Sequence, residues 1–153
     1  MQKIASFQIN HDTLEKGMYV SRIDGDIITY DIRMKLPNGG DYLTPDGMHT
    51  FEHLFATYAR NSLFKEGVIY VGPMGCRTGF YLLLRDSVSK ADAIQLVRES
   101  MAFISGFEGE IPGSKKEECG NYLAHDLSDA KVWAADMEKV LSNWTEKDLA
   151  YKE

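Results

Sequence analysis

The chain has 153 residues, of which 17 are basic and 23 acidic, and its formal net charge at pH 7 is -6. Its length predicts a single domain over residues 1–153, and a composition that is 44% apolar, 26% charged and 11% aromatic excludes disordered and collagen-like chains. The acidic balance and the lack of a basic stripe argue against nucleic-acid binding.

The first residues lack the apolar core of a signal peptide, and no apolar run approaches the roughly 20 residues that a bilayer requires. We therefore expect a cytoplasmic protein without membrane contact. A reducing compartment would keep the two cysteines, Cys76 and Cys119, as thiols that can act as metal ligands or acid/base groups.

Three segments are typical of strands. Residues 26–36 alternate and predict a half-buried strand ending at a turn over 37–40, with Ile28, Tyr30, Ile32 and Met34 on one face and Thr29, Asp31 and Arg33 on the other. Residues 67–72 and 78–84 are the other two segments. The link between them, 73–77, is too short for a crossover and favours antiparallel neighbours.

Three segments have helical spacing. Apolar residues recur over about 48–64 as Phe51, Leu54, Phe55 and Tyr58, after Ser89 as Ile94, Val97, Met101 and Ile104, and over about 128–143 as Val132, Trp133, Met137, Val140 and Leu141. Ser89 with Asp92 resembles a helix cap, and Gly106 ends that helix. Mixed strands and helices without regular alternation predict the α+β class, an antiparallel sheet packed with helices.

The first of these helices carries the pattern H-x-x-E-H, as His49, Glu52 and His53. At about 100° per residue, His53 lies about 40° round the axis from His49 and one turn along, so both imidazoles can reach one metal ion. Glu52 then lies near the ion without being an obvious ligand, a place for a carboxylate that moves protons. The alternative is a pair of ordinary, partly buried histidines on an amphipathic helix.

A catalytic centre needs a third protein ligand and one open position. The candidates are His11, His125, Cys76, Cys119 and any carboxylate. Cys119 precedes Gly120, which permits a turn, and a His2Cys set suits zinc, ferrous iron or cobalt. Cys76 has a glycine before it and another at Gly79, and Arg77 would favour a thiolate if its guanidinium lay close. Each cysteine is also compatible with a purely structural role.

The sequence resembles the S-ribosylhomocysteine lyases, which make the precursor of autoinducer-2. The matching stretches follow the family order and spacing through most of the chain: Ser6-Phe7, Asn10-His11, Asp31-Ile-Arg33, Pro37-Asn38, His49-Thr-Phe-Glu-His-Leu54, Pro73-Met-Gly-Cys-Arg-Thr-Gly-Phe-Tyr81, Cys119-Gly-Asn-Tyr122 and His125-Asp-Leu127. Many members carry Asp-Ile-Ser where this chain has Tyr70-Val71-Gly72, and a cysteine where it has Lys35. These departures affect expected substrate contacts, whereas the metal and acid/base positions are intact.

The resemblance implies a site with several assigned residues. The implied metal ligands are His49, His53 and Cys119, holding ferrous iron that zinc or cobalt can replace; the implied acid/base pair is Cys76 and Glu52; and Ser6, His11 and Arg33 match positions that line a substrate pocket. The resemblance also implies a homodimer with shared active sites. The family reaction converts S-ribosylhomocysteine to homocysteine and 4,5-dihydroxy-2,3-pentanedione.

Two other functions share parts of this pattern. H-x-x-E-H is also the signature of inverzincin peptidases, which are much larger and usually take a downstream glutamate as third ligand. A non-catalytic metal-binding paralogue is the second alternative, and a closed structural site would need a fourth protein ligand from His11, His125, Cys76 or a carboxylate.

Overall fold

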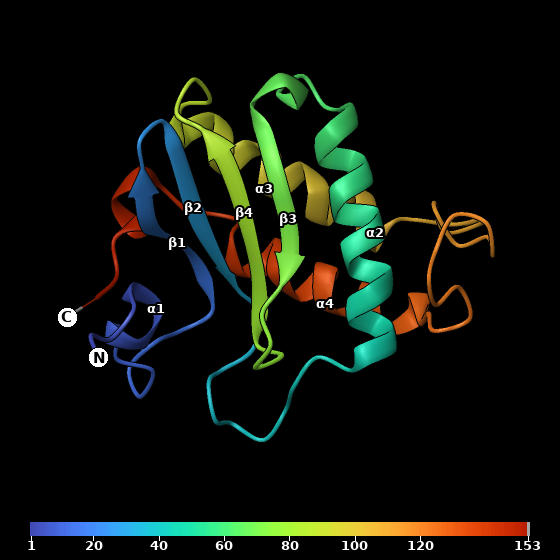
Figure 1. Cartoon of the computed structure of the whole chain (residues 1–153), viewed down its shortest axis with the longest axis horizontal. Coiled ribbons are helices and arrows are strands. Elements are labelled where there is room, and N and C mark those ends of the chain that lie inside the picture. The colour runs from blue at the N-terminus through green and yellow to red at the C-terminus, as the bar shows by residue number, and fades with distance from the viewer. Residues whose placement is uncertain (153) are drawn as a thin grey trace.

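The computed structural model describes residues 1–152, and within them the chain forms a four-stranded antiparallel sheet in the order β1-β2-β4-β3 (Figure 1). The strands are β1 Gly17–Asp24, β2 Ile27–Arg33, β3 Val68–Pro73 and β4 Gly79–Arg85. The helices are α1 Ala5–Gln8, α2 Pro45–Asn61, α3 Lys90–Ser105 and α4 Leu127–Val140, with short 3-10 turns at Lys65–Gly67 and Glu146–Leu149. The predicted α+β class is confirmed.

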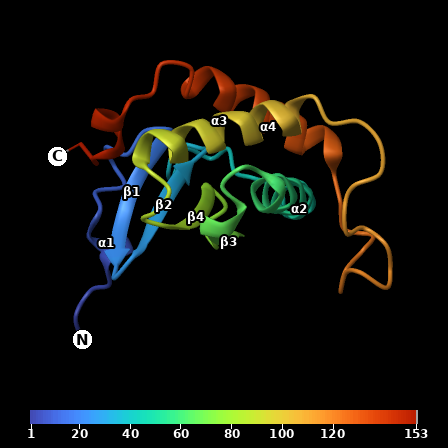
Figure 2. The same ribbon diagram turned by 90° about the horizontal axis from the view of Figure 1, so that it is seen from above.

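The helices leave one face of the sheet open. Figure 2 shows α3 and α4 on one face and α2 beside the β3 edge, whereas the other face carries α1 near β1. The core lies between the sheet and α2, α3 and α4, where Phe51, Phe55, Phe80, Leu82 and Met101 are fully buried. No helix among residues 1–152 is long and apolar enough to cross a membrane.

Strand β2 is buried on both faces at its end, so the prediction of a half-buried strand is wrong there. Ile28, Tyr30 and Ile32 face the core as predicted, but Asp31 and Arg33 on the opposite face are only 1% and 2% exposed. The two side chains form an ion pair of 2.8 Å, and Tyr151 donates to Asp31 at 2.7 Å. The C-terminal segment thus covers a charged pair that the alternation assigned to solvent.

Helix α2 begins and ends about three residues before its predicted bounds. Pro45 occupies the first turn, where its fixed φ suits a helix and its missing N–H leaves no helical bond unmade. At the other end, the Ser62 N–H and hydroxyl both donate to the carbonyl of Ala59, one of the four terminal carbonyls without a helical partner, and the Asn61 side chain donates to the carbonyl of Thr57. Leu63, inside the predicted helix, is 96% exposed.

Helix α3 follows the prediction, whereas α4 ends at Val140, three residues before its predicted end near residue 143. The Ser89 hydroxyl accepts from the Asp92 N–H, so the predicted cap is present, and Asp126 caps α4 in the same way through Asp129. Val132, counted with the apolar residues of α4, is 66% exposed and lies outside the core.

Neither β1 nor α1 was predicted from the hydrophobic pattern. Strand β1 does not alternate, because Met18 and Tyr19 are successive and both buried, whereas Ile23 near its end is 59% exposed. Helix α1 has four residues and no buried side chain, too short for a hydrophobic period.

Gly47 on α2 is the contact point with α4, since a Cβ there would collide with the Trp133 ring. Helix propensity alone would make Gly47→Ala stabilising by up to about 1 kcal/mol. We expect instead a loss of about 1–3 kcal/mol in the free energy of unfolding, because overpacking displaces Trp133. Urea denaturation checks this, and Trp133→Leu in the same chain should recover part of the loss; a more stable single variant would contradict it.

Candidate metal centre and Cys76 cavities

Helix α2 places His49 and His53 one turn apart on the same side. Their rings are T-shaped, with centroids 4.5 Å apart and planes 82° to each other, so their in-plane nitrogens can converge. The segment that follows α3, residues 107–126, lies beside α2 in Figure 1 and supplies the facing groups.

Backbone carbonyls of this segment fix both imidazoles. His49 Nδ1 lies 2.8 Å from the carbonyl of Ala124, and His53 Nδ1 lies 2.8 Å from that of Pro112. A carbonyl can only accept, so each Nδ1 carries the proton and each Nε2 presents a lone pair. This is the outer hydrogen bond that usually orients a metal-ligating histidine.

A glycine lets the segment approach His53. Gly113 has a φ of +71°, and a Cβ at this position would lie 3.1 Å from His53 Nδ1. The left-handed conformation and the close approach both favour glycine next to the carbonyl that holds the ring.

Cys119 and His125 complete a cluster with the two helical histidines. The candidate ligand atoms of His49, His53, Cys119 and His125 all lie within 4.8 Å of one another. Cys119 Sγ is 3.4 Å from His49 Nε2 and accepts from the Asn121 N–H. Three imidazoles and a thiol are the donor set of a transition-metal site rather than of magnesium or calcium. The sequence indicated His125 only as one of several candidate ligands, because its place beside α2 depends on how residues 107–126 fold back.

His125 is held differently from the other two imidazoles. Its Nδ1 is 2.9 Å from the hydroxyl of Thr50 on α2, and its ring stacks on that of His49 with centroids 4.0 Å apart. Its buried Nε2 has no hydrogen-bond partner among the described residues. Burial, followed by the proximity of the ionisable rings of His49 and His53, lowers the pKa of His125 below its ordinary value, which favours the neutral ring at pH 7.

Cys76 lies at the tip of the β3–β4 hairpin and is exposed. The Arg77 N–H donates to the carbonyl of Met74, which closes a turn with Gly75 and Cys76 at its centre. The guanidinium of Arg77, the residue next to Cys76, lies over the Tyr42 ring and donates to the carbonyl of Leu43.

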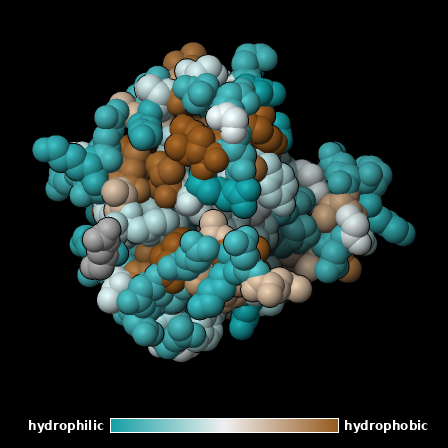
Figure 3. Space-filling view, turned by 60° about the vertical axis from the view of Figure 1, so that its left-hand side comes forward, coloured by the Kyte–Doolittle hydropathy of each residue, from teal (hydrophilic) through white to brown (hydrophobic). Residues whose placement is uncertain are grey.

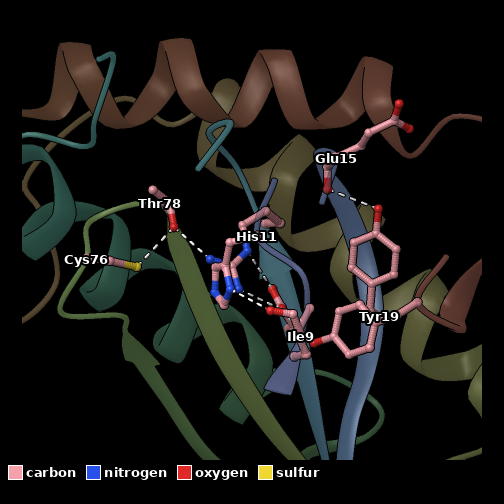
Figure 4. Close-up of polar contacts among 9 residues, drawn as sticks. Ile9, His11, Glu15, Tyr19, Cys76 and Thr78 are labelled. Carbon is pink, nitrogen blue, oxygen red and sulfur yellow. Dashed lines mark hydrogen bonds and ion pairs between the residues drawn. The ribbon is translucent and has the colours of Figure 1, made fainter. Parts of the chain in front are cut away.

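Arg33 reaches Cys76 through one hydroxyl. Its Nη1 donates to Thr78 Oγ1 at 2.7 Å, and Thr78 Oγ1 lies 3.0 Å from Cys76 Sγ (Figure 4). Because a guanidinium has no acceptor, Thr78 Oγ1 accepts from Arg33, and the hydrogen bond between Thr78 and Cys76 can run in either direction. Burial opposes the charge of Arg33, but the hydrogen bonds and the charge of Asp31 outweigh it and raise the pKa of the guanidinium.

The residues matched to a substrate pocket gather beside Cys76. Ser6, His11, Arg33 and Cys76 line one cavity of about 280 Å³, and His11 and Cys76 share a second of about 190 Å³ with Thr78. His11 Nδ1 lies 2.8 Å from the carbonyl of Ile9, so it donates there and leaves Nε2 to accept (Figure 4). Neither cavity is lined by Glu52, which lies half-buried on α2, or by any member of the metal cluster.

Two residues of β3 that depart from the family pattern, Tyr70 and Gly72, lie against each other. A side chain at Gly72 would collide with the Tyr70 ring, which is 52% exposed on the open face of the sheet. Tyr70 lines a hollow of about 410 Å³ there, together with Ile4, Tyr81 and Leu83. Lys35, which also departs from the family pattern, pairs with Asp41 at 2.9 Å.

Comparison with known proteins decides the family. The family model described as S-Ribosylhomocysteinase (LuxS) matches residues 4–148. The chain belongs to this family. It is 46% identical to the S-ribosylhomocysteine lyase of Clostridium acetobutylicum over 158 residues, covering 100% of both chains. The lyases of Porphyromonas gingivalis and Borreliella afzelii are 46% and 42% identical, each with 99% of both chains covered.

Membership in the S-ribosylhomocysteinase family bears out the resemblance seen in the sequence and argues against the inverzincin interpretation, which shared only the H-x-x-E-H pattern. The match runs through β1 and α1 as well, the two elements that hydrophobic periodicity did not reveal.

Tyr151 lies at one end of a series of hydrogen-bonded side chains that leads through Asp31, Arg33 and Thr78 to Cys76. Burial, followed by the charge of Asp31, raises the pKa of Tyr151, so its hydroxyl stays protonated and donates to Asp31. Tyr151→Phe leaves a buried carboxylate with one donor fewer and should cost about 1–3 kcal/mol of unfolding free energy. Chemical denaturation measures this against Tyr122→Phe; equal stabilities for the two variants would show that the hydroxyl contributes nothing.

Proposed function

We propose that this chain is the carbon–sulfur lyase of its family, converting S-ribosylhomocysteine to homocysteine and 4,5-dihydroxy-2,3-pentanedione. The observation that carries the proposal is the full-length match to lyases at 42–46% identity, together with the convergent His/Cys cluster on α2. The two free thiols suit a reducing compartment, and we place the enzyme in the cytoplasm on that basis.

The reaction explains why proton-moving groups are needed. A thioether leaves readily only when negative charge develops on the carbon next to the one that bears sulfur, and the aldose carbonyl begins too far away. The carbonyl has to move from C1 to C2 and then to C3, and each shift removes a proton beside a carbonyl. Loss of the C4 proton then expels homocysteine from C5. Each step requires one group that removes a proton from a sugar carbon and another that returns a proton.

His49, His53 and Cys119 are the proposed metal ligands. Their donor atoms lie within one ion's reach, and the carbonyl-bound Nδ1 atoms direct two Nε2 lone pairs inward. We assign ferrous iron as the ion, with zinc or cobalt able to replace it, since imidazole and thiolate suit all three. The bound ion would supply Lewis-acid polarisation of a substrate oxygen.

Cys76 and Glu52 are the proposed acid/base pair. The Thr78 hydroxyl accepts from Arg33 Nη1 and lies 3.0 Å from Cys76 Sγ, so it can hold the sulfur in place beside the cavity that Thr78 and Cys76 both line. Three of the five guanidinium N–H groups of Arg33 bond to Asp31 and Thr78, and the others remain for a sugar hydroxyl in the cavity. His11 offers Nε2 as an acceptor, and Ser6 adds a hydroxyl at the cavity wall.

A homodimer with shared active sites completes the proposal. The open face of the sheet carries exposed apolar side chains, including Ile4 at 55%, Phe7 at 68% and Tyr70 at 52%, and Figure 3 shows hydrophobic side chains gathered on this side of the molecule. Exposed apolar patches of this kind mark interaction surfaces. The Cys76 cavities and the metal cluster share no lining residue, so a second copy of the chain would bring complementary parts together.

The first test addresses turnover. Protein purified without air should contain about one iron per chain and release thiol from S-ribosylhomocysteine. Cys76→Ala should keep the metal and lose at least about 100-fold in turnover, the range expected for an acid/base group. His49→Ala should lose the metal itself. Normal homocysteine release by Cys76→Ala would contradict its role, and metal-dependent cleavage of a peptide library would revive the peptidase interpretation.

The second test addresses assembly. Leu83 lies half-buried on the open face of the sheet, and Leu83→Glu places a charge in the proposed interface. This variant should sediment as a monomer and lose turnover while keeping its metal. Val132→Glu, on an exposed site of α4, is the matched control and should remain dimeric. A fully active monomer would exclude shared sites.

A further inference from the structure

His125 is the member of the cluster that the proposed reaction does not use. Its Nε2 is buried and has no partner among the described residues, and one of its ring nitrogens lies within 4.8 Å of the candidate ligand atoms of His49, His53 and Cys119. A buried polar atom without a partner carries a free-energy cost, so it indicates a ligand that belongs there. Two roles fit such an atom: a fourth metal ligand, or a hydrogen-bond donor to whatever else occupies the centre.

The hydrogen bonds of the Thr50 hydroxyl distinguish between the two roles. The Thr50 hydroxyl oxygen accepts from the Asp126 N–H at 2.9 Å and lies 2.9 Å from His125 Nδ1. Among the described residues, His125 Nδ1 is the one acceptor within reach of the hydroxyl proton. Thr50 therefore donates to Nδ1, and the single proton of a neutral imidazole is left on Nε2. A protonated Nε2 has no lone pair for a metal.

Ring geometry leads to the same result independently. A metal ion lies close to the plane of an imidazole that binds it, about 2.0–2.1 Å from the nitrogen. The rings of His49 and His125 are stacked at 4.0 Å with planes only 17° apart, so their in-plane directions run side by side and do not meet at one ion. The rings of His49 and His53, at 82°, do allow this.

We propose that His125 is a hydrogen-bond donor of the metal centre and not a ligand, and that its Nε2–H binds an oxygen atom of the sugar as it enters. This inference rests on the proposed ligand set of His49, His53 and Cys119. The partner of each Nδ1 decides the role of its ring: a backbone carbonyl makes His49 and His53 lone-pair donors, and the Thr50 hydroxyl makes His125 a proton donor.

The direct test is the tautomer of each histidine in the zinc-loaded protein. With 15N-labelled histidine, NMR should place the proton of His125 on Nε2 and those of His49 and His53 on Nδ1. Zinc bound at His125 Nε2, with the proton on Nδ1, would overturn the proposal. The measurement needs no substrate and no turnover, so it stands apart from the test of the lyase reaction.

Variants test the consequence for binding. In a Cys76→Ala background, His125→Asn removes the donor but keeps an amide near Nδ1, and His125→Gln returns an N–H near Nε2. His125→Asn should keep one zinc per chain and bind S-ribosylhomocysteine about tenfold more weakly by calorimetry, and His125→Gln should recover part of that loss. Loss of zinc from His125→Asn, or unchanged binding, would overturn the proposal. No binding by Cys76→Ala alone would count against the proposed substrate and leave the NMR result intact.

Discussion

The buried ion pair of Arg33 and Asp31 is the constraint around which the site is built. Two charges removed from water must be paired and hydrogen-bonded, or the fold loses several kcal/mol. Strand β2 supplies both partners, Thr78 just before β4 accepts one guanidinium N–H, and Tyr151 donates to the carboxylate. The sheet centre, the Cys76 hairpin and the C-terminal segment are thereby fixed relative to one another by a single charged pair.

Predictions from the sequence were most reliable where the position of a side chain depends on one partner that is near it in the chain. The positions of His49 and His53 follow from helical periodicity, and the Ser89 cap follows from a spacing of three residues. The antiparallel β3–β4 pair follows from a link too short for a crossover. In each case the determining interaction lies within one element or one turn.

The errors have the opposite origin. Asp31 and Arg33 were assigned to the solvent side because alternation does not reveal a tail that returns from residue 151. Arg77 was considered for Cys76 because it is the next residue, but the contact is made by Arg33, whose link through Thr78 spans 45 positions. His125 lies 75 positions from Thr50, and only the folded segment 107–126 brings them together. Long-range contacts between polar side chains leave no period in the sequence.

The close approach of Tyr70 to Gly72 couples two positions on the open face of the sheet. A side chain at position 72 would meet the far end of the Tyr70 ring, so the ring would have to rotate from its present place. Because Tyr70 is 52% exposed, it has room to rotate, but the rotation changes the hollow that the ring lines with Ile4, Tyr81 and Leu83. The shape of this hollow therefore depends on both positions, and the effect of a substitution at one depends on the residue at the other.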